Sequence, residues 1–296
     1  MIPKFLEKLL EEEYGNELTN KIIDGYSKKR FVTLRVNTIK TNISKIKEVL
    51  DNLNIRYQEV EWYKDALIVE NALESDLEKL DIYNNGEIYL QSLSSMLPPL
   101  LLEPKKNESI LDMTAAPGGK TTQMVALSNN EALITACEKN KIRADRLKYN
   151  LVKQGANRVG VIVNDARKLD DFLSFDKILL DAPCSGSGTL NLDEDISSFN
   201  EELVKRSCQI QHELLKKAIK LLKPNHEMIY STCSILKEEN EKILEYFINK
   251  NLIEIVPLDN NIIKVLPTLP TTIQNTLCVC PTKLYEGFFV AKLRKK

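Results

Sequence analysis

Two cysteines that follow apolar runs are the residues of this chain best suited to covalent chemistry. Cys184 lies in LLDAPCSGSGT (179–189) and Cys233 in IYSTCS (229–234), and small polar residues flank both thiols. Such segments after predicted strands are loops, where functional residues concentrate. A deprotonated cysteine is a strong nucleophile, and Asp181 supplies a carboxyl group nearby for proton transfer or hydrogen bonding.

The other four cysteines fit structural roles, and no metal site is predicted. Cys137 lies within the apolar run ALITACE and Cys208 within a helical stretch, so we expect both to be core residues. Cys278 and Cys280 complete the six, none of which forms a C-x-x-C pair. With only two histidines besides, the chain lacks the ligand spacing of a zinc site.

A glycine turn precedes a helical stretch in ILDMTAAPGGKTTQ (110–123). Glycines in such a turn let a ligand approach the backbone, and the start of the helix offers free N–H groups. The letters GGKT suggest a loop for a nucleotide triphosphate, but that pattern requires glycine where this chain has Thr114. A plain strand-to-helix turn is the alternative, and the segment alone does not decide between a ligand site and such a turn.

An acidic residue ends each of the next two apolar runs. Glu138 follows ALITAC and Asp165 follows GVIVN. Ligands bind at the carboxyl ends of strands in open parallel sheets, where an acid after the second strand accepts hydrogen bonds from a ribose diol. The alternative is that both acids cap the following helices, which is the commoner role for either acid taken alone.

The elements that must position these residues alternate from residue 109 onward. Short runs rich in apolar and β-branched residues predict strands, and helical stretches lie between them. This alternation is typical of an α/β fold with parallel strands and helices on both faces. The predicted strands are 109–113, 132–138, 160–165, 175–183, 226–234 and 285–293, and the predicted helices are 119–129, 140–154, 200–222 and 238–249.

The first hundred residues predict a smaller α+β unit. The strand–helix–strand–strand order is compatible with a ferredoxin-like sheet, a layout that many RNA-recognition modules share. LPPLLLEP (97–104), with its three prolines, marks the expected junction, so we predict an N-terminal module at 1–90 and a second domain at 91–296. Helices are expected at 4–14, 17–28 and 43–53, and strands at 31–38, 55–62 and 66–70.

Four motifs in this order resemble one protein family. DMTAAPGGKTTQ, LLDAPCSGSGT, YSTCS and the closing GFFVAKL are similar to segments of the RNA 5-methylcytosine methyltransferases. This is the RsmB/NOP family, which includes bacterial Fmu/Sun and eukaryotic NOL1/NOP2/Sun proteins. The likeness implies a class I (Rossmann-like) S-adenosylmethionine methyltransferase fold, with a smaller N-terminal α+β domain. It also implies transfer of a methyl group to carbon 5 of cytosine in RNA.

The same resemblance implies a set of cofactor-binding residues. The Pro-Gly-Gly turn would contact the methionine end of S-adenosylmethionine, Glu138 the ribose hydroxyls and Asp165 the adenine. Arg143 matches a further position of the cofactor site, and Asp181 would line both the cofactor and the cytosine. The residues of the turn itself are Ala115, Ala116, Pro117, Gly118, Gly119, Lys120 and Thr121.

The resemblance also implies which cysteine attacks. Carbon 5 of cytosine is a poor nucleophile until a thiolate adds to carbon 6. DNA enzymes use the cysteine of their Pro-Cys motif, here Cys184, whereas the RNA family uses the Thr-Cys-Ser cysteine, here Cys233. We follow the RNA assignment, in which Cys184 assists release of the product. Asp181 would then hydrogen-bond the ring nitrogen.

Two positions depart from the family pattern. Thr114 stands where members usually carry cysteine. The usual helix-rich stretch after Pro-Cys-Ser-Gly is short and acidic here, NLDEDISS (191–198). The second departure affects the loop that is expected to face RNA.

RNA is the expected partner although the net charge of the chain is only -1. Residues 138–168 contain nine Lys and Arg against three acidic residues, and residues 1–50 contain ten against seven. Such clusters are candidates for phosphate contacts, although a solvated helix face is at least as common a role for each lysine. The target cytosine must be unstacked, in a loop, a bulge or a flipped position of tRNA or rRNA.

Other classes of protein are disfavoured. No apolar run approaches the roughly 20 residues of a membrane helix, and the acidic start MIPKFLEKLLEEEYG is neither a signal nor a transit peptide. We therefore expect a cytoplasmic, monomeric enzyme with reduced thiols. The competing hypotheses are a non-catalytic RNA-binding or assembly factor, and a methyltransferase that acts on DNA or protein. The presence of both loop cysteines and Asp181 counts against the first, and the Thr-Cys-Ser motif against the second.

Overall fold

The computed structural model describes residues 2–296, and the chain divides into two compact units. The cysteine unit holds both cysteine motifs and comprises residues 1–30, 171–174 and 180–296. The glycine-turn unit holds the Pro-Gly-Gly turn and comprises residues 31–170 and 175–179. Each unit has its own secondary structure and its own set of predicted site residues.

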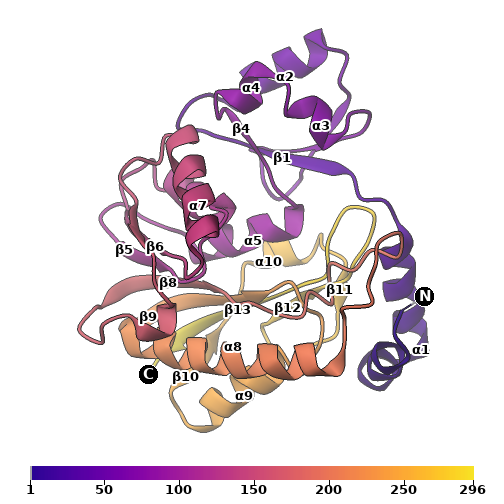
Figure 1. Cartoon of the computed structure of the whole chain (residues 1–296), viewed down its shortest axis with the longest axis vertical. Coiled ribbons are helices and arrows are strands. Elements are labelled where there is room, and N and C mark those ends of the chain that lie inside the picture. The colour runs from indigo at the N-terminus through magenta and orange to yellow at the C-terminus, as the bar shows by residue number, and fades with distance from the viewer. Residues whose placement is uncertain (1) are drawn as a thin grey trace. The chain divides into compact units, whose positions relative to one another are not determined.

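The glycine-turn unit contains the small antiparallel sheet that the first hundred residues predict (Figure 1). Leu34 pairs with Leu67 on one side and with Leu90 on the other, so one apolar row crosses three strands. Helix α2 (Ile43–Asn52) packs its buried Ile46 into the core of this sheet. The strands lie in the order β2 (Tyr57–Glu59), β3 (Ala66–Val69), β1 (Val32–Val36) and β4 (Ile88–Leu90).

Three short elements of this region escape prediction from the sequence. They are β4 and the helices α3 (Glu74–Leu77) and α4 (Asp81–Asn84). Each has only three or four residues, too few for a periodic pattern to appear. The predicted strands and helix of the small sheet are confirmed, and β4 adds its fourth strand.

The expected junction at 97–104 is instead largely part of a buried helix. Helix α5 spans Leu93–Leu102 and contains two prolines. Proline lacks the N–H group that would bond the carbonyl four residues earlier. For Pro99 that carbonyl belongs to Ser95, and the Gln91 side chain donates to it at 3.0 Å instead. The helix therefore continues through a segment that indicated a break, and the expected domain boundary stays a prediction.

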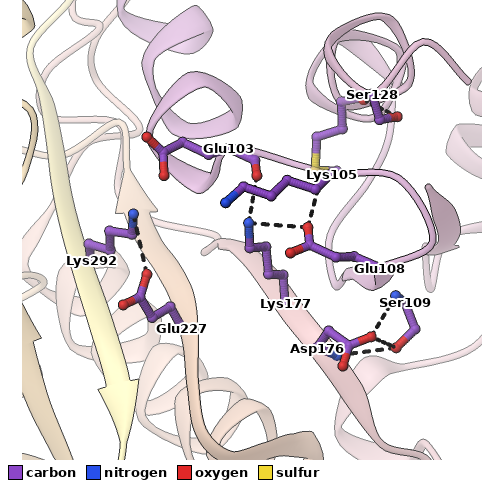
Figure 2. Close-up of polar contacts among 10 residues, drawn as sticks. Glu103, Lys105, Glu108, Ser109, Ser128, Asp176, Lys177, Glu227 and Lys292 are labelled. Carbon is purple, nitrogen blue, oxygen red and sulfur yellow. Dashed lines mark hydrogen bonds and ion pairs between the residues drawn. The ribbon is translucent and has the colours of Figure 1, made fainter. Parts of the chain in front are cut away.

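The glycine-turn unit also contains the parallel strands that lead to the turn, and the strands and helices predicted here are confirmed. Figure 2 shows how β5 and β8 are aligned at their start, where Asp176 accepts hydrogen bonds from N and Oγ of Ser109 at 2.8 and 2.9 Å. The strand order is β8 (Phe175–Asp181), β5 (Ser109–Asp112), β6 (Leu133–Cys137) and β7 (Gly160–Ile162). The helices that follow β5, β6 and β7 are α6 (Gly119–Leu127), α7 (Lys141–Lys153) and the 3-10 helix η1 (Ala166–Lys168).

The cysteine unit is built on two long antiparallel strands, β9 (Leu222–Thr232) and β13 (Phe288–Lys295). Helix α8 (Glu201–Leu221) contacts both β9 and α9 (Glu241–Asn249). These four elements confirm the prediction. Elements that were not predicted are β10 (Ile253–Val256), α10 (Asn260–Ile263), β11 (Thr268–Leu269) and β12 (Leu277–Val279).

Helix α1 (Lys4–Ser27) belongs to the cysteine unit and reaches its loops. Gly15 interrupts the helix with φ +73, so the two predicted short helices are confirmed as two segments of one. The Tyr26 hydroxyl, near the end of α1, donates to the carbonyl of Ser187 at 2.5 Å. The carbonyl of Tyr26 in turn accepts from the backbone of Leu192 at 3.0 Å.

Candidate active site

The structure brings the two predicted cysteines together. Cys184 follows β8 and Cys233 follows β9, and their Sγ atoms are 3.0 Å apart. All six cysteines are free, and a disulfide would be shorter, at about 2.05 Å. The contact is therefore a hydrogen bond between thiols, and either sulfur can be its donor.

Backbone contacts hold the two loops that carry these thiols against each other. We call residues 182–189 the Pro-Cys loop and residues 233–240 the Thr-Cys loop. The N–H of Gly188 donates to the carbonyl of Cys233 at 3.0 Å. Gly188 has no room for a side chain, because a Cβ there would lie 2.0 Å from the carbonyl oxygen of Gly287. A glycine at this position therefore permits the close approach of Gly287, just before β13, whose N–H donates to the carbonyl of Gly188 at 2.8 Å.

Asp181, the third predicted catalytic residue, is half-buried at the end of β8. The Ser231 hydroxyl donates to Asp181 Oδ1 at 2.7 Å. The carbonyl of Ser231 also accepts from the N–H of Ala182 at 2.7 Å, which fixes the pairing of the two segments. The strand that leads to Cys233 thus orients this carboxylate as well.

Sequence reasoning missed a buried carboxylate between the loops. Glu239 has no exposed surface, and it accepts hydrogen bonds from N and Oγ of Ser185 at 2.7 and 2.6 Å and from Oγ of Ser234 at 2.5 Å. Burial raises the pKa of this carboxyl group. In the sequence the residue lies in the charged run KEENEK, which is typical of a solvated helix start, so no signal distinguished it.

The surroundings of the thiols differ. The hydrogen bond with Cys233 is the main cause of a raised pKa of Cys184, followed by burial and by the nearby charge of Glu239. Burial is the main cause that raises the pKa of Cys137 and of Cys208 to about 12. Cys137 is fully buried, as expected for a core residue, whereas Cys208 is half-buried on α8. Because its pKa is raised above the ordinary value of a thiol, Cys184 is a neutral thiol at physiological pH.

The Pro-Gly-Gly turn of the other unit is fixed by helix α7. Arg143 and Asn150 donate to the carbonyls of Ala116 and Pro117, each at 2.8 Å. Gly118 has φ +109, a conformation that favours glycine. Arg143, which is predicted to belong to the cofactor site, thus supports the turn through its side chain.

The first polar residues of α6 are bonded within the protein. Lys120 Nζ donates to Oγ of Ser95 at 2.7 Å, and Oγ1 of Thr121 donates to Asp112 Oδ2 at 2.7 Å. Thr121 and Asp112 are both buried. The side chain of Thr121 therefore braces the turn against the end of β5.

The two strand-end acids have different partners. Glu138 is buried and accepts from the N–H of Asn140, and Arg143 Nε lies 3.8 Å from it. Asn140, rather than Glu138, caps α7. Asp165 does cap η1, and it also accepts from Arg167 Nη2 at 2.6 Å. The hydrogen bond from Arg167 lowers the pKa of Asp165 to about 2.

A second residue that the sequence did not signal is Arg35, which has no exposed surface. Its Nε donates to Gln91 Oε1 at 3.1 Å and its Nη2 to Thr122 Oγ1 at 3.0 Å, so it links β1 of the small sheet to α6. Burial lowers its pKa. The alternation in FVTLRVNT would place this polar residue on a solvated face, which is why the pattern concealed it.

Neither a metal site nor a membrane span emerges from the described residues. Among residues 2–296, no three His, Cys, Asp or Glu side chains are grouped so that they could hold a metal ion. No helix in the same range is long and apolar enough to cross a membrane. The expected absence of a bound metal stays a prediction.

Two family models match this chain. Residues 99–294 match the 16S rRNA methyltransferase RsmB/F model. Residues 2–76 match the ferredoxin-like domain of the RsmF/B-like methyltransferases. The first match alone covers more than half of the 296 residues, so the resemblance that the four motifs indicate is confirmed.

Curated relatives align with nearly the whole chain. Ribosomal RNA small subunit methyltransferase F of Shewanella oneidensis is 32% identical over 99% of this chain and 63% of its own length. The 28S rRNA (cytosine-C(5))-methyltransferase of Mus musculus is 33% identical over 98% of this chain and 38% of its own length. The chain thus spans about three fifths of the bacterial relative.

Solved structures share the fold over the full length. The crystal structure of PH0851 has a TM-score of 0.88 and 32% identity, and covers 99% of this chain and 66% of its own. A methyltransferase homolog protein from Pyrococcus horikoshii has a TM-score of 0.84 and 30% identity over 100% of this chain and 96% of its own. The predicted α/β methyltransferase fold with a smaller N-terminal α+β part is therefore confirmed.

Proposed function

This chain belongs to the 16S rRNA methyltransferase RsmB/F family, and we propose that it transfers a methyl group from S-adenosylmethionine to carbon 5 of cytosine in RNA. The contact that carries the proposal is the 3.0 Å approach of Cys184 to Cys233. Two relatives are named as methyltransferases of small-subunit and 28S ribosomal RNA, which supports ribosomal RNA as the first substrate to examine. Transfer RNA remains the alternative.

Cys233 is the proposed nucleophile. Its thiolate adds to carbon 6 of the cytosine, and the electron pair of the C5–C6 bond makes carbon 5 nucleophilic. S-adenosylmethionine supplies an electrophilic methyl group when bound. Transfer of the proton from carbon 5 to a water molecule and cleavage of the C6–S bond then restore the aromatic ring and return the Cys233 thiolate.

Cys184 and Asp181 are the proposed supporting groups. Because Cys184 is a neutral thiol 3.0 Å from Cys233, it is placed to donate a hydrogen bond to that sulfur as it leaves carbon 6. Ser231 orients the carboxylate of Asp181. We propose that the Asp181 carboxyl group donates a proton to the ring nitrogen N3 as the thiolate adds to carbon 6 and takes it back when the C6–S bond breaks, which stabilises the displaced electron density.

The Pro-Gly-Gly turn and the two strand-end acids are the proposed cofactor contacts. The turn suits a ligand because Gly118 has no side chain that would block the approach to its backbone. The hydrogen bond from Arg143 to the carbonyl of Ala116 holds the turn in this shape. Glu138 is proposed to accept hydrogen bonds from the ribose hydroxyls. Asp165 is ionised and accepts two hydrogen bonds at each oxygen from Arg167. We propose that the adenine takes the place of one of these bonds.

A basic hollow on the cysteine unit is the proposed phosphate contact. Lys28, Lys29 and Lys283 line a hollow of about 540 Å³ at the end of α1, where Asp24 pairs with Lys28 at 2.9 Å. Three cations against one anion favour a phosphate group. Tyr26 of the same helix end holds the Pro-Cys loop, so RNA bound here would lie on an element that contacts a cysteine loop.

Bisulfite sequencing of RNA from strains with and without the gene tests this proposal. Methylation at carbon 5 protects cytosine from conversion, so a cytosine that is protected only when the gene is present is the expected result. Its position would show whether the substrate is ribosomal or transfer RNA. Identical conversion in both strains, with the protein expressed in one of them, would refute the proposed function.

A further inference from the structure

One carboxylate inside the cysteine unit contacts the residue that follows each loop cysteine. Ser185 comes directly after Cys184 and Ser234 directly after Cys233, and both serines donate to Glu239. We infer that Glu239 is a positioning residue that holds the two thiols in contact and contributes to keeping Cys184 in its neutral form. The inference deepens the proposed function and depends on it for the roles of the two cysteines.

The geometry of these contacts leaves the two loops little freedom. Cys184 and Cys233 are 49 residues apart in the sequence, so only tertiary contacts set their distance. Glu239 Oε1 accepts from N of Ser185, and Oε2 accepts from the hydroxyls of both Ser185 and Ser234. A shift of either loop would break a hydrogen bond to a fully buried carboxylate, which is costly.

Glu239 is itself held in place by two neighbouring elements. Gln211 of α8 is fully buried, and its Nε2 donates to Glu239 Oε1 at 3.3 Å and to the carbonyl of Pro183 at 3.0 Å. Both partners are acceptors, so the orientation of the amide is fixed. The hydroxyl of Tyr230 on β9 donates to the carbonyl of Glu239 at 2.7 Å. The residues on both sides of Cys184 are thus anchored.

The charge of Glu239 has a second consequence for Cys184. The groups that donate hydrogen bonds to Glu239 are a peptide N–H, two hydroxyls and an amide, and all of them are neutral. These bonds favour the ionised carboxylate, and its charge contributes to the raised pKa of Cys184. The other titratable groups that face this charge are Cys208 on α8 and Tyr230 on β9, and burial raises the pKa of both.

The pH dependence of alkylation of Cys184 tests the inference. Iodoacetamide reacts with thiolates, and peptide mass spectrometry follows Cys184 separately from the other thiols. In Glu239→Gln the midpoint, which is the pH at which the alkylation rate of Cys184 is half of its maximum, should be lower than in the unmodified protein. If it falls by about one pH unit, alkylation at pH 7.5 should be about tenfold faster, because the thiolate fraction rises in proportion. A residue that only supports the fold would change the rate at every pH without moving the midpoint.

Glu241→Gln is the matched control. Glu241 is also a buried glutamate at the start of α9, but it accepts from the N–H of Thr272 at 3.4 Å instead of from a cysteine loop. We expect the pH profile of Cys184 alkylation in Glu241→Gln to match that of the unmodified protein. A wild-type midpoint in folded Glu239→Gln would overturn the charge effect.

Oxidation by diamide reports how readily the two thiols meet. Diamide takes two hydrogens from the thiols and becomes the hydrazine, while Cys184 and Cys233 form a disulfide. Diamide also reacts with thiolates, so the cross-linking rate is divided by the alkylation rate of Cys184 at the same pH. Glu239→Gln should lower this ratio about tenfold, and an unchanged ratio would overturn the positioning role. If that variant does not fold, Ser234→Ala removes one donor only and should still lower the ratio, whereas a wild-type ratio would overturn the role. Neither measurement needs RNA or cofactor, so its outcome is independent of whether the protein methylates RNA.

Discussion

The cysteine loops and the two strand-end acids, Glu138 and Asp165, are held in place by different kinds of contact. Ser185 donates to a carboxylate 54 residues away in the sequence, and that carboxylate is fully buried. Around these acids the partners are local, since Glu138 contacts Asn140 and Asp165 contacts Arg167, two residues on in each case. Arg167 keeps part of its side chain in solvent.

This difference fits the two tasks that we propose. The proposed covalent reaction needs the sulfur atoms of Cys184 and Cys233 at a fixed separation. Buried hydrogen bonds between segments distant in the sequence hold the two loops in a single arrangement. A cofactor must enter and leave, and a partly exposed ion pair such as Asp165–Arg167 has little to lose when a ligand shares the carboxylate. Changes in the cysteine loops should therefore act on the reaction, and changes near the turn should act on binding.

The largest effect is expected from Cys233→Ala. Without the proposed nucleophile, methyl transfer should fall by roughly 10³-fold or more, as in other enzymes that lose a covalent catalyst. Affinity for S-adenosylmethionine, measured by titration calorimetry, should stay within about twofold, because no binding residue is changed. Methylation within tenfold of the unmodified protein would show that Cys233 is not the nucleophile.

The next effect concerns RNA and the basic hollow. Replacing Lys28, Lys29 and Lys283 together by Ala should make the negative slope of log affinity against log salt less steep by about 2 to 3. Filter binding between low and moderate salt measures this slope. The matched control replaces three exposed lysines of the same unit, Lys250, Lys264 and Lys296, and should leave the slope unchanged. Equal slopes in both triple variants would mean that the hollow does not bind phosphate.

A smaller effect is expected on the cofactor side. Asp165→Ala should weaken binding of S-adenosylmethionine about 10- to 100-fold, since a hydrogen bond to a charged group contributes roughly 1.5 to 3 kcal/mol. Asp170→Ala, at an exposed acid of the same unit, serves as the control. Calorimetric titration that finds the same affinity for both variants would remove Asp165 from the cofactor site.

The smallest effect concerns stability and pH in the cysteine unit. Glu13 of α1 accepts from the N–H of Lys237 in the Thr-Cys loop, and burial raises the pKa of Glu13 from 4.5 to about 7. The folded state therefore binds more protons between these values, so the contribution of Glu13 is full below pH 4.5 and is lost as pH rises through 7. Asp165 has the opposite sign, because its pKa is lowered.

Glu13→Gln removes the charge that burial disfavours. The variant should be about 1 to 3 kcal/mol more stable than the unmodified protein at pH 8, with little difference at pH 5. Urea unfolding at the two pH values measures this difference. Equal gains at both pH values would point to packing instead of ionisation.

The contrast between local and distant contacts also explains how far the sequence could predict the structure. The strands and α-helices from residue 109 to the Thr-Cys loop follow local periodicity, and each was predicted near its observed bounds, whereas the three-residue 3-10 helix η1 was not predicted. Helix α5 was not, because Gln91 satisfies a carbonyl that its prolines leave free. Glu239 and Arg35 were not, because their partners lie far along the chain and no local pattern marks a charged residue as buried.

The site residues divide in the same way. Cys184, Cys233 and Asp181 were predicted as a group from their motifs, and the structure places them in one unit. The hydrogen bond between the thiols did not follow from the motifs, since it depends on loop contacts such as Gly188 to Cys233. The cofactor-binding roles of the turn and of the acids stay predictions until binding is measured.

The covalent complex of the Cys184→Ala variant tests the central claim most directly. If Cys233 attacks and Cys184 assists release, this variant should transfer the methyl group and then stay attached to RNA. Denaturing gel electrophoresis should show a protein–RNA band that requires S-adenosylmethionine, and Cys233→Ala and the double variant should show none. A band in Cys233→Ala but not in Cys184→Ala would exchange the two roles and contradict the account.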